Sequence, residues 1–228
     1  MKWLVTSLLS LGLLSGVCFS AERPPLSDLK AKESYSLGYQ FGQSLKVQGV
    51  DLDLEVYTSG IQDALSGSNP QLGADEIRRT VAELQIRLAA ARQKATQEAA
   101  AKNIAAAKVF LDENKAKDRV VTLPSGLQYK VLVEGSGRTP KASDAVTVNY
   151  RGTLIDGTEF DSSFKRGKPA TLQVSSVIRG WSEALQLMKE GSKWQLFLPP
   201  HLAYGERSAG PIPPGSALVF DVELVSVN

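Results

Sequence analysis

The segment VTVNYRGTLIDGTEFDSSF, residues 146–164, alternates apolar and polar side chains ahead of a turn. Val146, Val148 and Tyr150 recur at every second position, which is the period of a β-strand with one buried face. The sequence IDG at residues 155–157 is typical of a turn. The segment therefore predicts a half-buried strand of an antiparallel sheet, followed by a turn, and it sets the class of the domain around it.

The same period of two recurs toward the C-terminus. Residues 193–198 and 218–224 alternate in the same way, and Gly- and Pro-rich turns separate the alternating segments. One helical pattern, at about residues 181–189, falls between them. A single helix on the apolar face of an antiparallel sheet makes an α+β domain. We predict that residues 119–228 form a twisted antiparallel sheet wrapped on one short helix.

An all-α domain is predicted to precede this sheet, at residues 21–73. Aromatic and aliphatic side chains recur at helical spacing over residues 26–67, with a break at residues 49–51. Asp53 is the expected N-cap of the second helix and Gly67 its stop. Helices this short must bury an apolar face against another surface.

A long connecting helix is predicted at residues 74–118. Residues 75–117 contain neither Gly nor Pro, and Asp75 is expected to cap their start. Ten alanines occupy residues 89–107; alanine favours helix but buries little area. We expect the first half to pack and propensity to hold the second. The segment is a solvated linker or a rigid arm of ~65 Å, and the absence of Gly and Pro favours the arm. An apolar stripe runs along the first half at steps of four and three: Ile77, Val81, Leu84, Leu88, Ala91 and Ala95.

Residues 1–20 have the pattern of a secretory signal peptide. Lys2 precedes an apolar stretch, and small residues at Cys18 and Ser20 suit cleavage after Ser20. A lipoprotein signal at Cys18 is the rival interpretation, which Val17 disfavours. We expect an exported protein, in the periplasm or alternatively at the outer membrane or cell surface, with no membrane span once the signal is removed.

Most enzyme chemistry lacks candidate residues. The only cysteine lies in the predicted signal, and His201 is the only histidine. We therefore predict no metal and no cofactor. The 26 Lys and Arg residues are interspersed with 24 Asp and Glu residues, so no nucleic-acid partner is expected. The side chains that remain as candidates are aromatic: Tyr150, Phe160, Trp181, Tyr204 and Phe220.

Aromatic residues in a sheet are more often core than site, and Trp181, which follows Gly180 at a helix start, fits either role. Two features favour a site. Asp161 follows Phe160 directly, and an acid in an apolar surrounding needs a hydrogen-bond partner or water. The Gly- and Pro-rich segment at residues 202–220 has Tyr204 near its start, and long loops of this kind often cover a site.

These segments resemble the FK506-binding class of peptidyl-prolyl isomerases in order and spacing, over about residues 124–227. The motifs that carry the resemblance are VTVNYRGTLIDGTEFDSSF, VIRGWSEALQLM, LAYGERS and PIPPGSALVFDVELV. SYSLGYQFGQSLKVQGVDLDLEVYTSGIQDALSG and LPSGLQYKV are similar to the bacterial long form of the macrophage infectivity potentiator type. That branch implies a homodimer through the N-terminal helices, with a long helix that carries the isomerase domain.

The resemblance also implies the roles of individual residues. Trp181 would be the floor on which a substrate proline ring rests. The Ile178 N–H and the Tyr204 hydroxyl would hold substrate carbonyls, and Asp161 would accept hydrogen bonds from Tyr150 or Arg166, or polarise the substrate. The implied catalytic residues are Tyr150, Asp161 and Tyr204. The implied substrate-binding residues are Phe160, Val177, Ile178, Trp181, Ile212 and Phe220.

Isomerisation of an Xaa-Pro bond breaks no bond, so a site without acid, base or metal suits it. We predict an isomerase of exported, proline-containing polypeptides that desolvates and stabilises a twisted amide in an aromatic pocket. FK506- and rapamycin-like macrolides are the expected inhibitors. The alternative is a dimeric periplasmic chaperone, or holdase, in which residues 26–67 bind clients. A third reading is a virulence-associated interaction protein at the cell surface, with isomerisation secondary.

Overall fold

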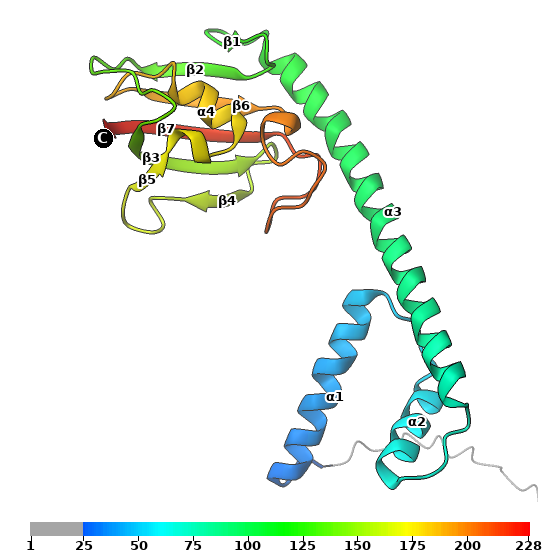
Figure 1. Cartoon of the computed structure of the whole chain (residues 1–228). Helices are drawn as coiled ribbons and strands as arrows, with labels where there is room; N and C mark the ends of the chain where they lie inside the picture. Colours follow the sequence, from blue (N-terminus) through cyan, green and yellow to red (C-terminus); the bar gives the residue numbers. More distant parts are fainter. Residues whose placement is uncertain (1–24) are drawn as a thin grey trace, which may run out of the picture. The chain divides into compact units, whose positions relative to one another are not determined.

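The computed structural model describes residues 25–228, and the predicted signal peptide lies outside the described residues. The chain divides into two compact units, which meet between Gln71 and Leu72. The first unit holds α1, Leu29–Gln48, and α2, Leu54–Ser66. The second holds α3, Ala74–Asn114, a seven-stranded antiparallel sheet and the short helix α4, Arg179–Leu185 (Figure 1). The predicted fold class, helices followed by an α+β domain, is confirmed.

The two helices of the first unit begin and end at residues suited to capping. Asp53 accepts hydrogen bonds from the second and third backbone N–H groups after it, at 3.0 and 3.1 Å, which confirms it as the N-cap of α2. Gly49 and Gly67 end the helices in the left-handed conformation that favours glycine. No residue of α1 or α2 is buried in the single chain. Among the described residues, no helix is both long and apolar enough to cross a membrane.

The long helix α3 has 41 residues and begins at Ala74, but it ends at Asn114, four residues before the end of the predicted range 74–118. Gly73, not Asp75, is its N-cap, and Asp75 lies in the first turn, where a negative charge favours the helix dipole. The last residue of the helix is Asn114, whose side chain is buried and donates a 2.9 Å hydrogen bond to Gln128 Oε1. The chain turns there to enter the sheet.

The expectation that the second half of α3 is held largely by propensity needs correction, because this half also packs against the sheet. Ala100 is 3% exposed and Ala107 is 1% exposed, and both are buried in the second unit. Phe110, one turn further on, packs against Phe197 of the sheet with ring centroids 6.1 Å apart. Small side chains on this face let the helix backbone approach the domain closely, so the alanines contribute packing as well as propensity.

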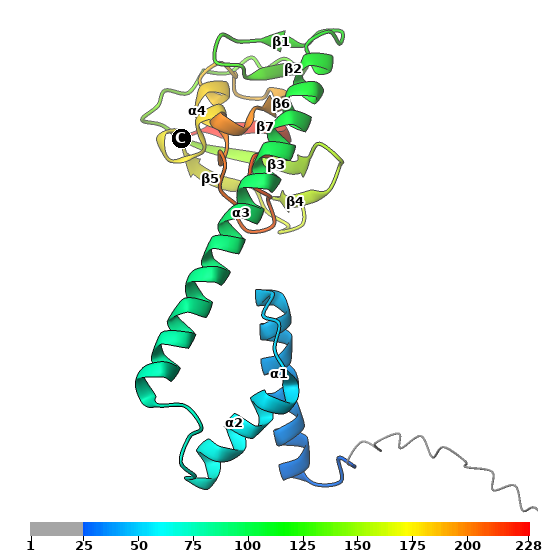
Figure 2. The same ribbon diagram turned by 90° about the vertical axis from the view of Figure 1, so that its right-hand side faces the viewer.

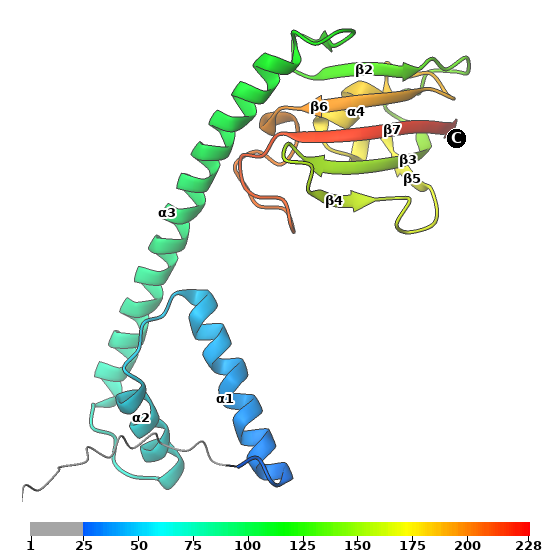
Figure 3. The same cartoon turned by 180° about the vertical axis from the view of Figure 1, so that it is seen from behind.

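The sheet has the strand order β1-β2-β6-β7-β3-β4, and β5 pairs with β3 beside β4 (Figure 3). Its two longest strands, β3 and β7, are neighbours, and their antiparallel register runs from Val146 opposite Val227 to Leu154 opposite Leu218. The strand bounds are β1 Val121–Thr122, β2 Gln128–Val133, β3 Ala145–Leu154, β4 Glu159–Ser162, β5 Ala170–Gln173, β6 Lys193–Leu198 and β7 Leu218–Val227. Two 3₁₀ turns complete the domain, η1 Val174–Ser176 and η2 Pro200–Leu202.

One face of the sheet is buried against α4, as the alternation predicts (Figure 1). The inward residues of the three central strands are Val146 and Val148 of β3, Trp194, Leu196 and Leu198 of β6, and Leu218, Phe220, Val222 and Leu224 of β7. From α4 and the turn after it, Trp181, Ala184, Leu185 and Met188 complete this core. The second half of α3 packs on the other face of the sheet, through the contact of Phe110 with Phe197. In Figure 2 this helix lies in front of the strands.

The sequence predicts the short helix α4 at residues 181–189. It begins two residues earlier, at Arg179, and ends four residues earlier, at Leu185. It includes Gly180, which the expected helix left outside. A Cβ at Gly180 would lie 2.6 Å from Leu198 Cγ and 2.7 Å from Leu198 Cδ2. Only a glycine lets the first turn of α4 come this close to β6, because a Cβ at that distance forces neighbouring atoms to shift.

We expect Gly180→Ala to lower the free energy of unfolding by about 1–3 kcal/mol through overpacking against Leu198. Urea unfolding of the folded chain measures this change. In the background of Leu198→Ala, which removes the clashing atoms, the cost of Gly180→Ala is expected to fall below about 0.5 kcal/mol. An equal cost in both backgrounds would show that the close contact with Leu198 is not the cause.

Candidate active site

A cavity of about 320 Å³ opens beside the buried Trp181. Its walls come from β3, β4, β5 and β7, from the segment that leads into α4, and from the loop that follows η2. The residues that line it are Tyr150, Phe160, Asp161, Leu172, Ser176, Val177, Ile178, Trp181, Tyr204 and Phe220. The volume is in the range of small-ligand pockets, and the lining is mainly aromatic and aliphatic.

Three edge-to-face aromatic contacts shape the cavity. The Trp181 ring lies 5.2 Å from the Tyr150 ring and 5.2 Å from the Phe220 ring, with interplanar angles of 86° and 85°. Phe160 meets Phe220 in the same way, with centroids 5.5 Å apart. Edge-to-face pairs at this separation are favourable and fix ring orientations. Trp181 is 4% exposed, yet it lines the cavity.

The aromatic contacts depend on a glycine in β3. Gly152 lies opposite Phe220 of β7 in the strand register. A Cβ at Gly152 would be 2.7 Å from ring atoms of both Phe160 and Phe220. The two rings therefore lie directly over the β3 backbone, and a larger residue at this position would displace them into the cavity.

A single carboxylate, Asp161, lies at the edge of the aromatic group. The Tyr150 hydroxyl donates to Asp161 Oδ2 at 2.5 Å, and the Asp161 backbone neighbour Ser162 donates its N–H to Oδ1 at 2.8 Å. Arg166 forms an ion pair with Asp161 and donates to the Tyr150 hydroxyl oxygen at 2.7 Å. The acid that the sequence singled out thus has the partners that an acid in apolar surroundings requires.

These contacts shift the ionisation of both groups. Burial acts to raise the pKa of the Asp161 carboxyl, but hydrogen bonds from Tyr150 and Arg166 outweigh it, and the pKa lies below its ordinary value. Burial and the hydrogen bond to Asp161 raise the pKa of the Tyr150 phenol. At neutral pH the site therefore holds a carboxylate and a neutral phenol, with no group poised to exchange protons.

Two polar groups at the cavity can bind a carbonyl oxygen. Ile178 is the N-cap of α4, and its own carbonyl accepts the N–H groups of Trp181 and Ser182 at 2.9 and 3.0 Å. Across residues 25–228, no protein acceptor is found for the Ile178 N–H. Tyr204 is 38% exposed at the start of the loop after η2. Both residues line the cavity.

The cavity brings together all of the site residues implied by the resemblance except Ile212. The Ile212 side chain is buried in the hydrophobic core, and its backbone forms a short bridge with Ala209. Leu172 and Ser176 line the cavity and were not among the candidates. The alternation of residues 170–173 could have indicated that Leu172 faces inward. No pattern in the sequence points to Ser176.

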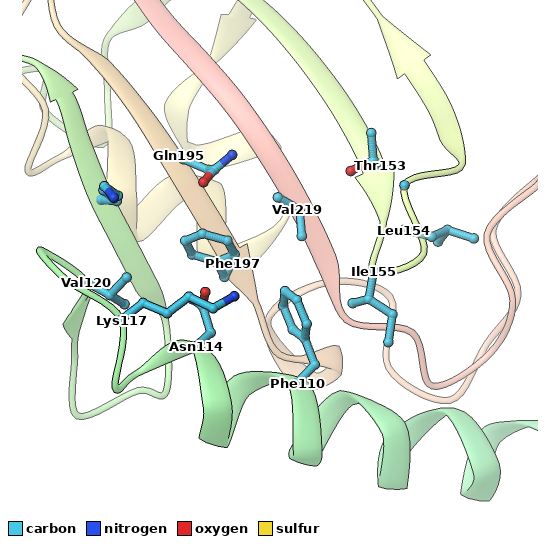
Figure 4. Close-up of a pocket in the computed structure, with 12 residues that line it drawn as sticks. Phe110, Asn114, Lys117, Val120, Thr153, Leu154, Ile155, Gln195, Phe197 and Val219 are labelled. Carbon is cyan, nitrogen blue, oxygen red and sulfur yellow. The ribbon is translucent and has the colours of Figure 1, made fainter.

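A second cavity, of about 290 Å³, lies between the end of α3 and the sheet face opposite α4 (Figure 4). Figure 4 shows Phe110 and Asn114 projecting from the helix toward Phe197 of β6, with Lys117 beside them. This cavity gathers no acid, and Asn114 is already hydrogen-bonded to Gln128. Within residues 25–228, no cluster of three metal-ligating side chains occurs.

The chain matches two family models in sequence. Residues 136–225 match the FKBP-type peptidyl-prolyl cis-trans isomerase model, and residues 30–131 match the domain amino terminal to FKBP-type peptidyl-prolyl isomerase. The first match contains the cavity, and the second contains α2, α3 and all of α1 but its first residue.

Relatives cover the same span. The chain is 44% identical over 229 residues to an outer membrane protein MIP of Legionella longbeachae, covering 100% of this chain and 98% of the relative. It is 43% identical over 229 residues to the peptidyl-prolyl cis-trans isomerase Mip of Coxiella burnetii, covering 100% and 99%. The crystal structure of FkpA from Escherichia coli aligns with a TM-score of 0.71 at 40% identity, covering 89% of this chain and 98% of that one. On these matches the chain belongs to the FKBP-type peptidyl-prolyl cis-trans isomerases, in the form with an amino-terminal helical domain.

Proposed function

We propose that the aromatic cavity beside Trp181 is where this isomerase binds the Xaa-Pro bond. The observation that carries the proposal is the edge-to-face group of Trp181, Tyr150 and Phe220 around a cavity that also presents carbonyl-binding donors. Trp181 is the floor under the proline ring, and Phe160 and Val177 form the walls. Ile178 N–H and the Tyr204 hydroxyl hold the substrate carbonyls, and Asp161 orients Tyr150.

Such a site accelerates isomerisation without proton transfer. Amide resonance gives the Xaa-Pro bond a barrier of ~18–20 kcal/mol. The twisted transition state has lost part of its C–N double-bond character and is less polar than the planar amide. An apolar, water-poor pocket favours the twisted form over the ground state, and oriented donors hold its carbonyl oxygen. Unfolded and exported proline-containing polypeptides are the proposed substrates, and FK506- and rapamycin-like macrolides the inhibitors.

Replacement of Trp181 by alanine is expected to lower kcat/KM for a proline peptide about 10- to 100-fold, because the floor and two aromatic contacts are lost. Trp181→Phe is expected to keep the fold and activity within about fivefold of the wild type. Protease-coupled turnover and near-UV circular dichroism measure the two effects. Trp194→Phe is the matched control, since Trp194 is buried in the same domain but does not line the cavity. A folded Trp181→Ala variant with wild-type turnover would remove Trp181 from the site.

The activity is expected to be independent of pH between about pH 5 and pH 9. The pKa of Asp161 is lowered from 3.8, so its interactions are intact above that value and weaken only as the pH falls through the lowered pKa. The pKa of Tyr150 is raised from 10.0, so the phenol stays protonated to higher pH. A kcat/KM profile checks this. Asp161→Asn is expected to cost about tenfold at all pH values in this window, and an inflection near neutrality in the wild type would refute the assignment.

We propose that the chain has three domains after the signal, at residues 21–73, 74–118 and 119–228. The first of them is proposed to form a homodimer. Val47 and Leu65 are both 84% exposed in the single chain, and neither helix of the unit has a buried residue. On α1, Gly38 and Gly42 lie in a shallow groove between tyrosines, with nothing within 4 Å of a Cβ at either glycine. Apolar surface of this extent favours a partner, and small residues let a second copy approach closely.

Export is part of the same proposal, with residues 1–20 as the signal peptide and the periplasm, or the outer membrane and cell surface, as the destination. One relative carries the name outer membrane protein MIP. A second candidate function, that of a holdase, is favoured by the exposed apolar helices α1 and α2, since a dimer of such helices offers surface to unfolded clients.

Sedimentation of the chain from Ala21 is expected to show a dimer, and a chain from Leu72 a monomer that retains turnover of short peptides. The second unit contains the whole cavity, so peptide activity does not need the first. Aggregation assays of an unfolded client separate the two functions. If the protein is a holdase, Tyr204→Ala is expected to suppress aggregation of the client as the wild type does, and the chain from Leu72 is expected not to suppress it. A monomeric chain from Ala21 would contradict the dimer.

A further inference from the structure

The loop between η2 and β7, residues 203–217, carries Tyr204 and also rests on α3. Asn103 Nδ2 donates a 2.8 Å hydrogen bond to the Pro214 carbonyl oxygen. A Cβ at Gly215 would lie 2.5 Å from the Ala100 carbonyl oxygen, so the loop touches the helix backbone. Figures 1 and 3 show the loop, in orange to red, beside α3. The contact needs a glycine on the loop and small residues on the helix.

A short series of bonds joins this contact to the active site. The Gly215 N–H donates to the Gly205 carbonyl oxygen at 2.9 Å, and the Gly205 N–H donates to the Pro200 carbonyl oxygen at 2.9 Å. Gly205 follows Tyr204 directly in the chain, and Tyr204 lines the cavity. The base of the loop is therefore held between α3 on one side and Tyr204 on the other.

The surface that α3 offers to the loop is itself fixed to the domain. Near its C-terminal end, Phe110 packs on Phe197 (Figure 4). Asn114 donates to Gln128 Oε1. Gln128 Nε2 returns a 2.9 Å hydrogen bond to the Leu111 carbonyl oxygen. These contacts attach the helix to the domain two to three turns beyond Asn103, on the same helix that presents the Asn103 amide to the loop.

We propose that Asn103 is a positioning residue of the isomerase: its hydrogen bond to Pro214 sets the place of Tyr204 through Gly215 and Gly205. The inference rests on the substrate-binding role given to Tyr204 under Proposed function. The middle of the loop is anchored separately, because Ile212 is buried in the core. Asn103 thus acts on the base of the loop, near Tyr204. The helix α3 is therefore a part of the catalytic domain as well as a connector.

Asn103→Asp tests the proposal, because it removes the donor, keeps the side-chain size and places an oxygen against the Pro214 carbonyl. We expect kcat/KM for proline peptides to fall about fivefold. This is the effect of losing one hydrogen bond from the displaced Tyr204 hydroxyl to the substrate carbonyl. Gln97→Glu is the matched control, since it makes the same chemical change at an exposed position of the same helix and is expected to leave turnover unchanged. Amide exchange of Gly215 is expected to become faster in Asn103→Asp only.

A double-mutant cycle with Tyr204→Phe separates positioning from a general effect on folding. If Asn103 acts through the Tyr204 hydroxyl, Asn103→Asp has little further effect once that hydroxyl is absent. An additive loss, or an Asn103→Asp variant that behaves like Gln97→Glu, would overturn the inference and leave the proposed site intact. Wild-type turnover in Tyr204→Phe alone would instead show that the proposed role of Tyr204 is wrong.

Gly215→Ala provides a second route to the same contact. Its Cβ would meet the Ala100 carbonyl oxygen, and its φ of +73° is strained for alanine. We expect a loss of kcat/KM at least as large as that of Asn103→Asp. Gly67→Ala controls for the strain alone, because Gly67 has a φ of +71° and nothing within 4 Å of a Cβ. Unchanged turnover in a folded Gly215→Ala variant would overturn the inference.

Discussion

Trp181 meets Tyr150 and Phe220 edge to face, and these contacts join α4 to β3 and β7, the two longest strands of the sheet. The indole is part of the core between the helix and the sheet, and it also lines the cavity. The same ring therefore contributes to stability and to the proposed proline site. Close packing ties the two together, because a displaced ring leaves a void in the core and changes the cavity at once.

Two glycines make this arrangement possible. Gly180 brings the start of α4 against Leu198, and Gly152 lets Phe160 and Phe220 lie on the backbone of β3. Asp161, Tyr150 and Arg166 then form a hydrogen-bonded group that places charge at the edge of the cavity. Each of the three side chains is bonded to the other two. An apolar centre with a satisfied polar edge suits a reaction that twists an amide and transfers no proton.

The second half of α3 shows how small side chains contribute packing. Ala100 and Ala107 are buried where the helix passes the domain, and Phe110 and Asn114 continue the same face at helical spacing. An alanine-rich helix buries little apolar area per residue, but it allows a close backbone approach. That approach is what places Asn103 within hydrogen-bond distance of the loop that carries Tyr204.

The sequence by itself determined the class of each region, because strand and helix periods and capping residues such as Asp53 are local properties. Its motifs also indicated the family and most of the cavity, from Tyr150 to Phe220. Tertiary structure alone decided that Ile212 turns into the core, that Leu172 and Ser176 line the cavity, and that α3 ends at Asn114. It also decided the contact of Asn103 with Pro214, 111 residues away. The physical reason is that each of these features depends on residues far apart in the chain, whose meeting no local pattern contains.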